Sequence, residues 1–252
     1  MIKVAYDAGH FYNTPGKRTP DGEREWTFND KVASAFANEL ALYKGVMTKR
    51  FDDPTGITDI PLKERTDGAN GWGADYYFSF HKNANTAQWG NWTGVETWIY
   101  SNASAKSIAL ANAIHPTVVA AYGLRDRGIK KGDLHILRET KMPAILIEGP
   151  FMDSIIDINK LRDITVLEKA GKLVARALAR YLGLKRIISE EDEEETLVTQ
   201  PIYEKDAKPS EWAASAVEWA KENGISDGTY LKRPATREEV ITMLYNMQTK
   251  LK

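Results

Sequence analysis

The chain of 252 residues contains no cysteine. This absence excludes disulfide bonds and thiolate metal sites, and it leaves histidine, aspartate and glutamate as the strong metal ligands. No apolar run approaches the roughly 20 residues that a membrane-spanning helix needs, so no membrane partner is expected. The first residues also lack the basic segment and long apolar core of a secretory signal. We therefore expect a soluble protein, synthesised in the cytoplasm, whose own N-terminus does not direct its export.

Blocks of basic residues are also absent, and the small net charge of −1 is unevenly distributed. Residues 1–186 carry 26 bases and 21 acids, whereas residues 187–206 carry one base and eight acids. The bases of the first segment are scattered, which argues against a nucleic-acid partner. A mildly cationic segment of this kind suits an anionic polymer instead.

Short apolar runs alternate with stretches of helical period over the first 185 residues. The apolar runs predict buried strands at residues 2–6, 45–50, 74–80, 94–101 and 143–148. Helical periodicity predicts helices at residues 27–43, 62–72, 105–122 and 161–181. This order predicts an α/β fold with a mixed, mostly parallel sheet flanked by helices. We expect residues 125–134 to form a loop, and His115, which lies beside Pro116, to be a surface or capping residue.

Composition divides the chain into three parts. Residues 1–186 have the length and the apolar content of one globular domain. The following stretch, 187–207, includes six consecutive acids at positions 190–195, which repel one another and predict a solvated linker. Residues 208–252 read as a small all-α module of two helices joined by a glycine-containing turn.

Two of the four histidines follow predicted buried strands. His10 comes shortly after the first strand and His81 directly after the third, where open α/β sheets place their ligands. A single histidine in such a place is more often structural than a ligand. Two acids strengthen the metal interpretation: Glu25, just ahead of a predicted helix, and Glu148, which ends another buried strand. A carboxylate there is costly unless it is paired, exposed in a cleft or bound to a metal.

Together these motifs resemble the zinc-dependent N-acetylmuramoyl-L-alanine amidases of the type-3 class, which occur as bacterial autolysins and phage endolysins. The resemblance covers most of the first 185 residues. It rests on residues 7–10, Glu25 with Asn29, residues 62–65 with Ala69 and Asn70, and residues 79–83, 94–97 and 143–149.

The resemblance implies a set of roles. Zn²⁺ would be held by His10, Glu25 and His81, with a fourth position open for water. Glu148 would be the general base and then the acid that protonates the leaving amine. Candidates for substrate binding are Asn83, Glu96 and His135.

Simpler roles remain open for several polar residues. Glu96 has the alternative of an edge-strand surface charge, and Arg65 is either a brace near the site or a surface or capping charge. Asn29 either caps its helix, the more common use, or supports the site. Trp89 and Trp92 either contact sugar rings or hold their loop in place.

The segment 208–252 resembles a single S-layer-homology module, a type that usually occurs in three copies and binds secondary cell-wall polymer. Its threonine and glutamate at positions 236 and 239 also form a capping box, which needs no function. One copy of about 40 residues has a marginal core. We therefore expect it to self-associate, to pack on the first domain or to bind the wall weakly.

The function predicted from the resemblance is hydrolysis of the amide between N-acetylmuramic acid and L-alanine in peptidoglycan. Two rivals remain, a zinc endopeptidase that cuts within the stem peptide and a non-enzymatic wall-binding protein. A nucleic-acid role is the least favoured. Without an export signal, the protein would reach the wall after release through a phage holin or by lysis of the producing cell.

Overall fold

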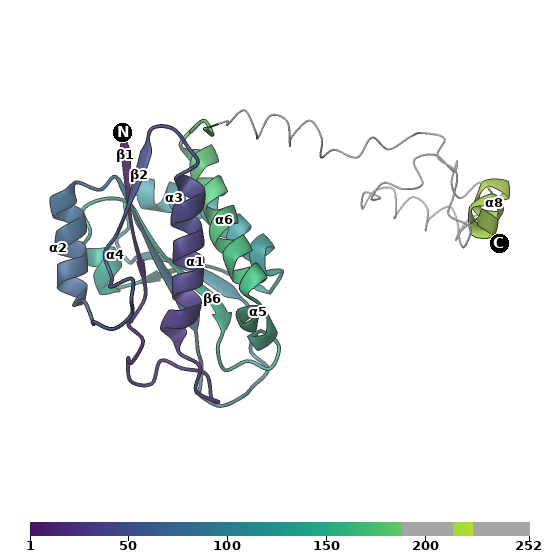
Figure 1. The fold of residues 1–252 in the computed structure, drawn as a ribbon, viewed down its shortest axis with the longest axis horizontal. Coiled ribbons are helices and arrows are strands. Elements are labelled where there is room, and N and C mark those ends of the chain that lie inside the picture. The colour runs from purple at the N-terminus through teal and green to yellow at the C-terminus, as the bar shows by residue number, and fades with distance from the viewer. Residues whose placement is uncertain (188–213, 224–252) are drawn as a thin grey trace. The chain divides into compact units, whose positions relative to one another are not determined.

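The computed structural model describes residues 1–187 and 214–223. The first unit of the chain is Met1–Ile187 (Figure 1). From the C-terminal unit one helix is described, α8 (Ala214–Glu222), which falls where the sequence predicts the first helix of the small module. Most of the acidic linker and the rest of the module lie outside the described residues, so those predictions stay predictions.

The first unit is built on one six-stranded sheet in the order β2-β1-β3-β6-β4-β5. The first four strands in this order, β2, β1, β3 and β6, run parallel to one another. Strand β4 is antiparallel to its neighbour β6 and parallel to β5. This confirms the predicted mixed, mostly parallel α/β fold. The strands are β1 (Ile2–Ala8), β2 (Val46–Arg50), β3 (Tyr76–Asn83), β4 (Val95–Tyr100), β5 (Asp126–Gly132) and β6 (Ala144–Phe151).

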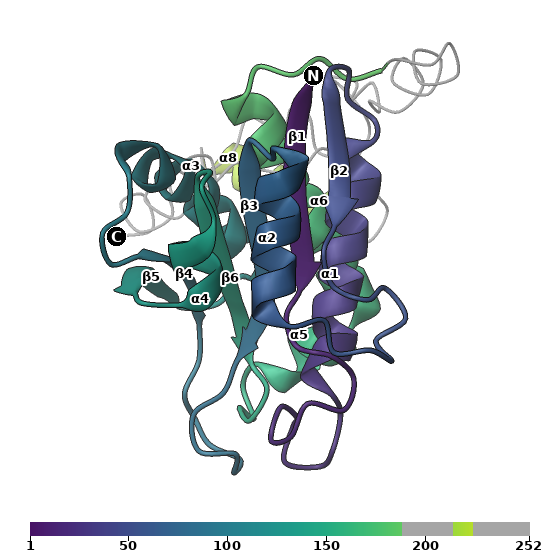
Figure 2. The same ribbon diagram turned by 90° about the vertical axis from the view of Figure 1, so that its left-hand side faces the viewer.

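Helices cover both faces of this sheet. One face packs against α1, α3 and α6, and the other against α2 and α4 (Figures 1 and 2). The helices are α1 (Glu25–Leu40), α2 (Leu62–Trp72), α3 (Ala105–Tyr122), α4 (His135–Glu139), α5 (Ile158–Arg162) and α6 (Ile164–Tyr181). Because both faces are covered, the central strands read as nearly continuous apolar runs, which is why the sequence reveals them.

Side-chain alternation assigns each strand residue to one layer. In β1, Val4, Tyr6 and Ala8 join the core beneath α1 and α6, whereas Ala5 joins the smaller core beneath α2 and α4. Asp7 follows Ala5 by two residues and therefore faces α2 as well. Polar side chains thus enter the second layer near the carboxyl ends of the strands.

Two predictions for the strands are wrong, and one helix was not predicted. Residues 126–132 form strand β5 rather than a loop, and the unpredicted helix α4 begins at His135. The sequence of β5, DRGIKKG, contains one branched apolar residue, so it carries no strand pattern; its pairing with β4 makes it a strand. Strand β6 also continues to Phe151, beyond its predicted end at residue 148, because it pairs with β3 as far as Asn83.

His115 is buried, which corrects its prediction as a surface or capping residue. Its Nδ1 lies 2.9 Å from Oγ1 of Thr97 on β4, and its Nε2 lies 2.8 Å from Oδ1 of Asp126 on β5. Both ring nitrogens therefore have partners, as a buried imidazole requires. This histidine links α3 to the two strands at one edge of the sheet.

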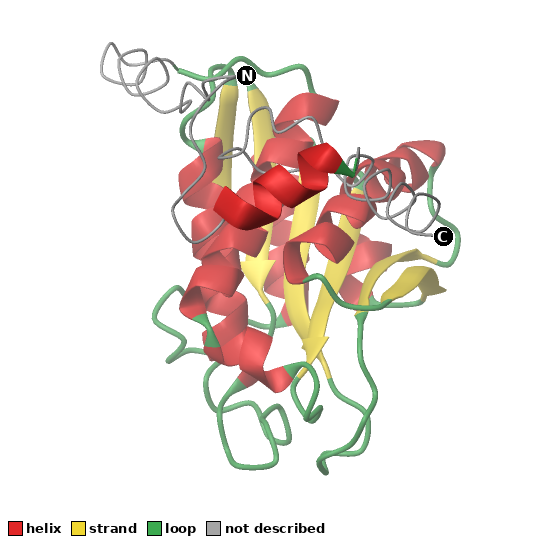
Figure 3. Ribbon diagram, turned by 90° about the vertical axis from the view of Figure 1, so that its right-hand side faces the viewer, coloured by secondary structure: helices red, strands yellow, loops and turns green. Residues whose placement is uncertain are grey.

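The long connections gather at one end of the sheet (Figure 3). Residues 11–24 and 84–94 both start where parallel strands end, so they lie beside the carboxyl edge of the sheet. This is where ligands bind in open α/β sheets. Within the described residues, no helix combines the length and apolarity that crossing a membrane requires.

Close packing of α1 on α6 depends on Gly171, and this generates a stability prediction. A Cβ atom at Gly171 would lie 2.3 Å from the carbonyl oxygen of Val32 and 2.9 Å from the amide nitrogen of Phe36. These are backbone atoms, so Gly171→Ala has to move a helix. We expect it to lower the free energy of unfolding by about 1–3 kcal/mol, measured by denaturant unfolding.

The matched control is Gly71→Ala near the end of α2, where an added Cβ meets no atom within 4 Å. Alanine there favours the helix and should raise the free energy of unfolding by about 0.5 kcal/mol. Equal effects of the two substitutions would contradict the close helix contact.

Candidate metal centre and active site

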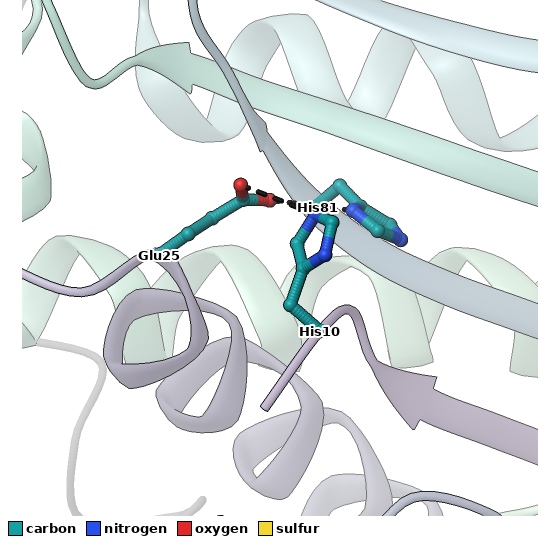
Figure 4. Close-up of side chains that lie close together, drawn as sticks. All are labelled: His10, Glu25 and His81. Atoms are coloured by element: carbon teal, nitrogen blue, oxygen red, sulfur yellow. Dashed lines mark hydrogen bonds and ion pairs between the residues drawn. The ribbon is translucent and has the colours of Figure 1, made fainter. Parts of the chain in front are cut away.

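Three potential metal ligands meet at the carboxyl edge of the sheet. His10 lies just past β1, His81 lies near the end of β3, and Glu25 is the first residue of α1. One ligand atom from each lies within 4.8 Å of the other two. The two imidazole rings are 4.9 Å apart at an interplanar angle of 87°, and each has one nitrogen beside the carboxylate (Figure 4). The structure therefore brings together the three predicted ligands.

The carboxylate of Glu25 is oriented through one oxygen. Its Oε1 accepts hydrogen bonds from the backbone nitrogen of Lys82 at 3.0 Å and from Nδ2 of Asn29 at 3.2 Å. The same oxygen lies 3.3 Å from Nδ1 of His81. The other oxygen, Oε2, is buried and has no hydrogen-bond partner, and neither does Nε2 of His10, which lies 3.3 Å away.

These unpartnered atoms fit a metal ion. A buried polar atom without a hydrogen-bond partner costs free energy. Two such atoms side by side therefore indicate that a ligand binds between them. Two ligands of a tetrahedral zinc ion lie about 3.3 Å from each other, given bond lengths of about 2.0–2.1 Å. The separation of His10 Nε2 and Glu25 Oε2 matches this value. Two imidazoles and one carboxylate are also a ligand set of catalytic zinc sites.

The electrostatics of His10 and Glu25 suit metal binding as well. Burial lowers the pKa of His10 to about 3, so its ring is neutral and can donate a lone pair. Burial alone would raise the pKa of Glu25, but the hydrogen bond from His81, the charge of that imidazole and the hydrogen bond from the amide of Lys82 bring it down to about 2. The acid is therefore ionised, as a ligand must be.

The backbone at His10 adopts an unusual conformation, with φ at 68°. Such a left-handed backbone costs a non-glycine residue about 1–3 kcal/mol. Arg65, which is 2% exposed, donates to the carbonyl oxygen of His10 at 2.9 Å and to Oδ2 of Asp7 at 2.8 Å. This buried guanidinium holds the chain on both sides of Gly9. The structure thus places Arg65 as a brace beside the site and not as a surface charge.

Glu148 lies next to His81 on the neighbouring strand, because the two are register partners of β3 and β6. Burial raises the pKa of Glu148 to about 7, against the opposing charge of His81. Its Oε2 is buried and has no hydrogen-bond partner. This carboxyl group therefore borders the three ligands without being one of the group.

Glu96 is the register partner of Glu148 on β4, so both acids lie on the same face of the sheet. It is buried and its Oε1 accepts a hydrogen bond from Nε of Arg127 on β5. Strand β4 lies inside the sheet, so the alternative of an edge-strand surface charge is wrong. The pairing with Arg127 neutralises one of two neighbouring carboxylates.

The other two predicted substrate-binding residues make separate contacts. Asn83 follows His81 by two residues and ends β3; its Oδ1 accepts a hydrogen bond from the amide of Ala84. His135 begins α4, and its Nε2 lies 3.3 Å from Oγ1 of Thr66 on α2. His135 is therefore not part of the ligand group.

Sequence reasoning missed or misassigned two residues that support the site. Asn29 does not cap α1, since the N-cap position is Arg24; it donates to Glu25 and to the carbonyl oxygen of Gly9 at 3.1 Å. Its position one turn after Glu25 was the available signal. Arg127 lies in the stretch predicted as a loop, so no pattern linked it to Glu96.

Comparison with known proteins identifies the family. The family model for N-acetylmuramoyl-L-alanine amidase matches residues 4–180. The chain therefore belongs to this amidase family, as its motifs predicted.

Individual relatives agree. The sporulation-specific N-acetylmuramoyl-L-alanine amidase of Bacillus subtilis (strain 168) is 34% identical over 192 residues, which cover 75% of this chain and 71% of that protein. The crystal structure of an N-acetylmuramoyl-L-alanine amidase from Clostridium difficile 630 superimposes with a TM-score of 0.67 at 32% identity, covering 72% of this chain and 97% of that one. An endolysin of Bacillus phage SPP1 is 32% identical over 154 residues, 57% of this chain and 55% of that protein. Relatives thus come from bacteria and from a phage.

Close approach at Gly9 generates a prediction about the ligands. A Cβ atom there would lie 2.1 Å from Cε1 and 2.3 Å from Nε2 of His81. Gly9→Ala therefore displaces the imidazole ring, and we expect zinc affinity to fall about 10- to 100-fold, as when support around a ligand is lost. Zinc titration against a competing chelator measures this change. Gly71→Ala serves as the remote control, and a Gly9→Ala variant that binds zinc as tightly as this control would refute the expectation.

Proposed function

We propose that this chain is a zinc-dependent amidase that hydrolyses the bond between N-acetylmuramic acid and the L-alanine of the stem peptide. The observation that carries the proposal is the arrangement of His10, Glu25 and His81 around unpartnered atoms at the carboxyl edge of the sheet. Family membership supplies the substrate class, peptidoglycan, and favours amidase over endopeptidase or non-enzymatic wall binding.

The roles of the three ligands follow from their donor atoms. When bound, zinc supplies Lewis acidity that polarises a carbonyl group and acidifies a water molecule. Nε2 of His10 and Oε2 of Glu25 would hold the ion, together with the imidazole of His81. Because Oε1 of Glu25 is already hydrogen-bonded, the carboxylate would coordinate through its free oxygen.

Glu148 is proposed as the proton carrier. Its carboxyl group lies beside His81 and has an oxygen without a partner, so it can receive a proton from the attacking water. It would return that proton to the nitrogen of L-alanine as the amide bond breaks. Arg127 would neutralise the charge of Glu96, the carboxylate that neighbours Glu148 on β4.

The remaining assignments are also proposals. Asn83, Glu96 and His135 would contact substrate near the scissile bond. Residues 208–252 would bind secondary cell-wall polymer or associate with a second copy. The protein would reach the wall after release by a phage holin or by lysis of the producing cell.

Two substitutions separate metal binding from proton transfer. We expect His81→Ala to be purified without zinc and without activity, because one of three ligands is gone. Glu148→Gln should retain zinc and lose activity by about 100- to 10,000-fold, the usual contribution of a positioned acid or base. Elemental analysis and release of peptide from purified walls measure the two quantities.

Product analysis of the wild-type protein completes this test. An amidase releases peptides with a free L-alanine amino group and leaves the glycan strands intact, and a chelator should stop the release. A Glu148→Gln protein that lacks zinc would contradict the division of roles. Cleavage inside the stem peptide would contradict the amidase assignment.

A further inference from the structure

The loop of residues 83–94 holds two tryptophans that the catalytic mechanism does not use. It connects β3 to β4, so it begins two residues after His81 and ends two residues before Glu96. The structure gives these tryptophans different environments. This difference shows which of the two holds the loop and which leaves its ring partly open to solvent.

Trp92 holds the loop. Its Nε1 donates to Oδ1 of Asp153 at 2.6 Å, and its ring lies over Gly90, where an added Cβ would be 2.2 Å from it. Asp153 is fully buried, and its other oxygen, Oδ2, accepts hydrogen bonds at 2.8–2.9 Å from three consecutive backbone amides, those of residues 85–87. This one carboxylate fixes both ends of the turn in the loop.

A second buried acid fixes the far end of the loop. Asp157 accepts hydrogen bonds from Oγ1 of Thr93 at 2.5 Å and from the amide of Gly94 at 3.1 Å. In addition, Gly90 and Ser154 form a β-bridge. The backbone is therefore held in one conformation although most of its side chains are exposed. A ligand that binds here meets a preorganised surface.

Trp89 is presented by this fixed loop. Its side chain is 40% exposed, and the guanidinium of Arg162 lies 5.9 Å from the ring centroid. Arg162 is itself held by Asp21 and Glu23 from the other long loop. An indole fixed on one side and open on another is suited to stacking a flat apolar surface.

The composition of the loop indicates what that surface is. All twelve residues from 83 to 94 are uncharged, in a chain of which 27% is charged. An average stretch of this length would contain about three charges. The loop instead offers amides, hydroxyls and aromatic rings, which suit the hydroxyl and acetamido groups and the apolar ring faces of sugars. The stem peptide carries carboxylates and amines, which charged side chains would recognise better.

We propose that Trp89 stacks on a sugar ring of the glycan strand, beyond the residue that carries the scissile bond. The proposal rests on peptidoglycan being the substrate. Trp89 follows His81 by eight residues, so their Cα atoms lie within about 29 Å of each other. A polymeric glycan that enters the site can reach the loop, whereas a single muramyl peptide need not.

Binding of glycan in the absence of peptide tests this directly. Peptide-free glycan strands are titrated into the full chain by calorimetry, with and without zinc. We expect Trp89→Ala to weaken binding about fivefold or more and Trp89→Phe, which keeps a ring, to weaken it less. Tyr181→Ala is the matched control, because Tyr181 is an aromatic residue of similar exposure, 38%. It ends α6, about 26 Å along the helix from Ile164, whereas Arg162, which contacts Trp89, lies just before the start of that helix.

Kinetics supply a second readout. The Trp89→Ala substitution should raise KM on intact walls by a larger factor than on a short muramyl peptide, with zinc content as in the wild type. Equal glycan binding by Trp89→Ala and Tyr181→Ala would overturn the proposal. The proposal would also be overturned if Trp89→Ala weakened the binding of free stem peptide and not that of glycan. A loss of zinc and of folding stability in Trp89→Ala would overturn it as well. Because glycan binding is also measured without zinc, its outcome does not depend on the metal assignment.

Discussion

The site depends on the carboxylate of Glu25, of which one oxygen is hydrogen-bonded and the other is not. Three groups surround Oε1 of Glu25, and they come from β3 and from the next turn of its own helix. Oε2 is left buried beside the imidazole of His10 without a hydrogen bond. The fold thus orients the carboxylate fully before any ligand is present, which lowers the cost of assembling a metal site.

The rest of the first domain positions the groups around that carboxylate. Arg65 holds the chain on both sides of Gly9, and the absence of a side chain at Gly9 gives the His81 ring its place. Pairing of β6 with β3 and with β4 brings Glu148 between His81 and Glu96. Apart from Arg65, which lies in α2, these residues lie in or beside strands of the sheet, so sheet register and a few buried polar contacts position the site.

Much of this could be predicted from the sequence, for a physical reason. Strands buried on both faces give continuous apolar runs, and polar residues directly after such runs mark the edge where ligands bind. His10, His81 and Glu148 were found in this way. Glu25 follows a loop of fourteen residues after His10 and not a buried strand, so its role as a ligand came from the resemblance.

Other features depend on contacts that no local pattern reports. The short strand β5 exists because it pairs with β4, and it brings Arg127 to Glu96. The separate environments of Trp89 and Trp92 depend on Asp153, which lies more than 60 positions further along the chain. Asn29 has the sequence context of a helix cap and is used to orient Glu25.

The most direct test of the account is anomalous diffraction at the zinc absorption edge from crystals of the zinc-loaded protein. We predict a single strong peak in the first domain, within about 2.2 Å of ligand atoms from His10, Glu25 and His81. Coordination by Oε2 of Glu25, with Oε1 keeping its hydrogen bonds, would agree with the orientation described above. A peak elsewhere in this domain, or one in which Glu148 replaces any of the three ligands, would contradict it.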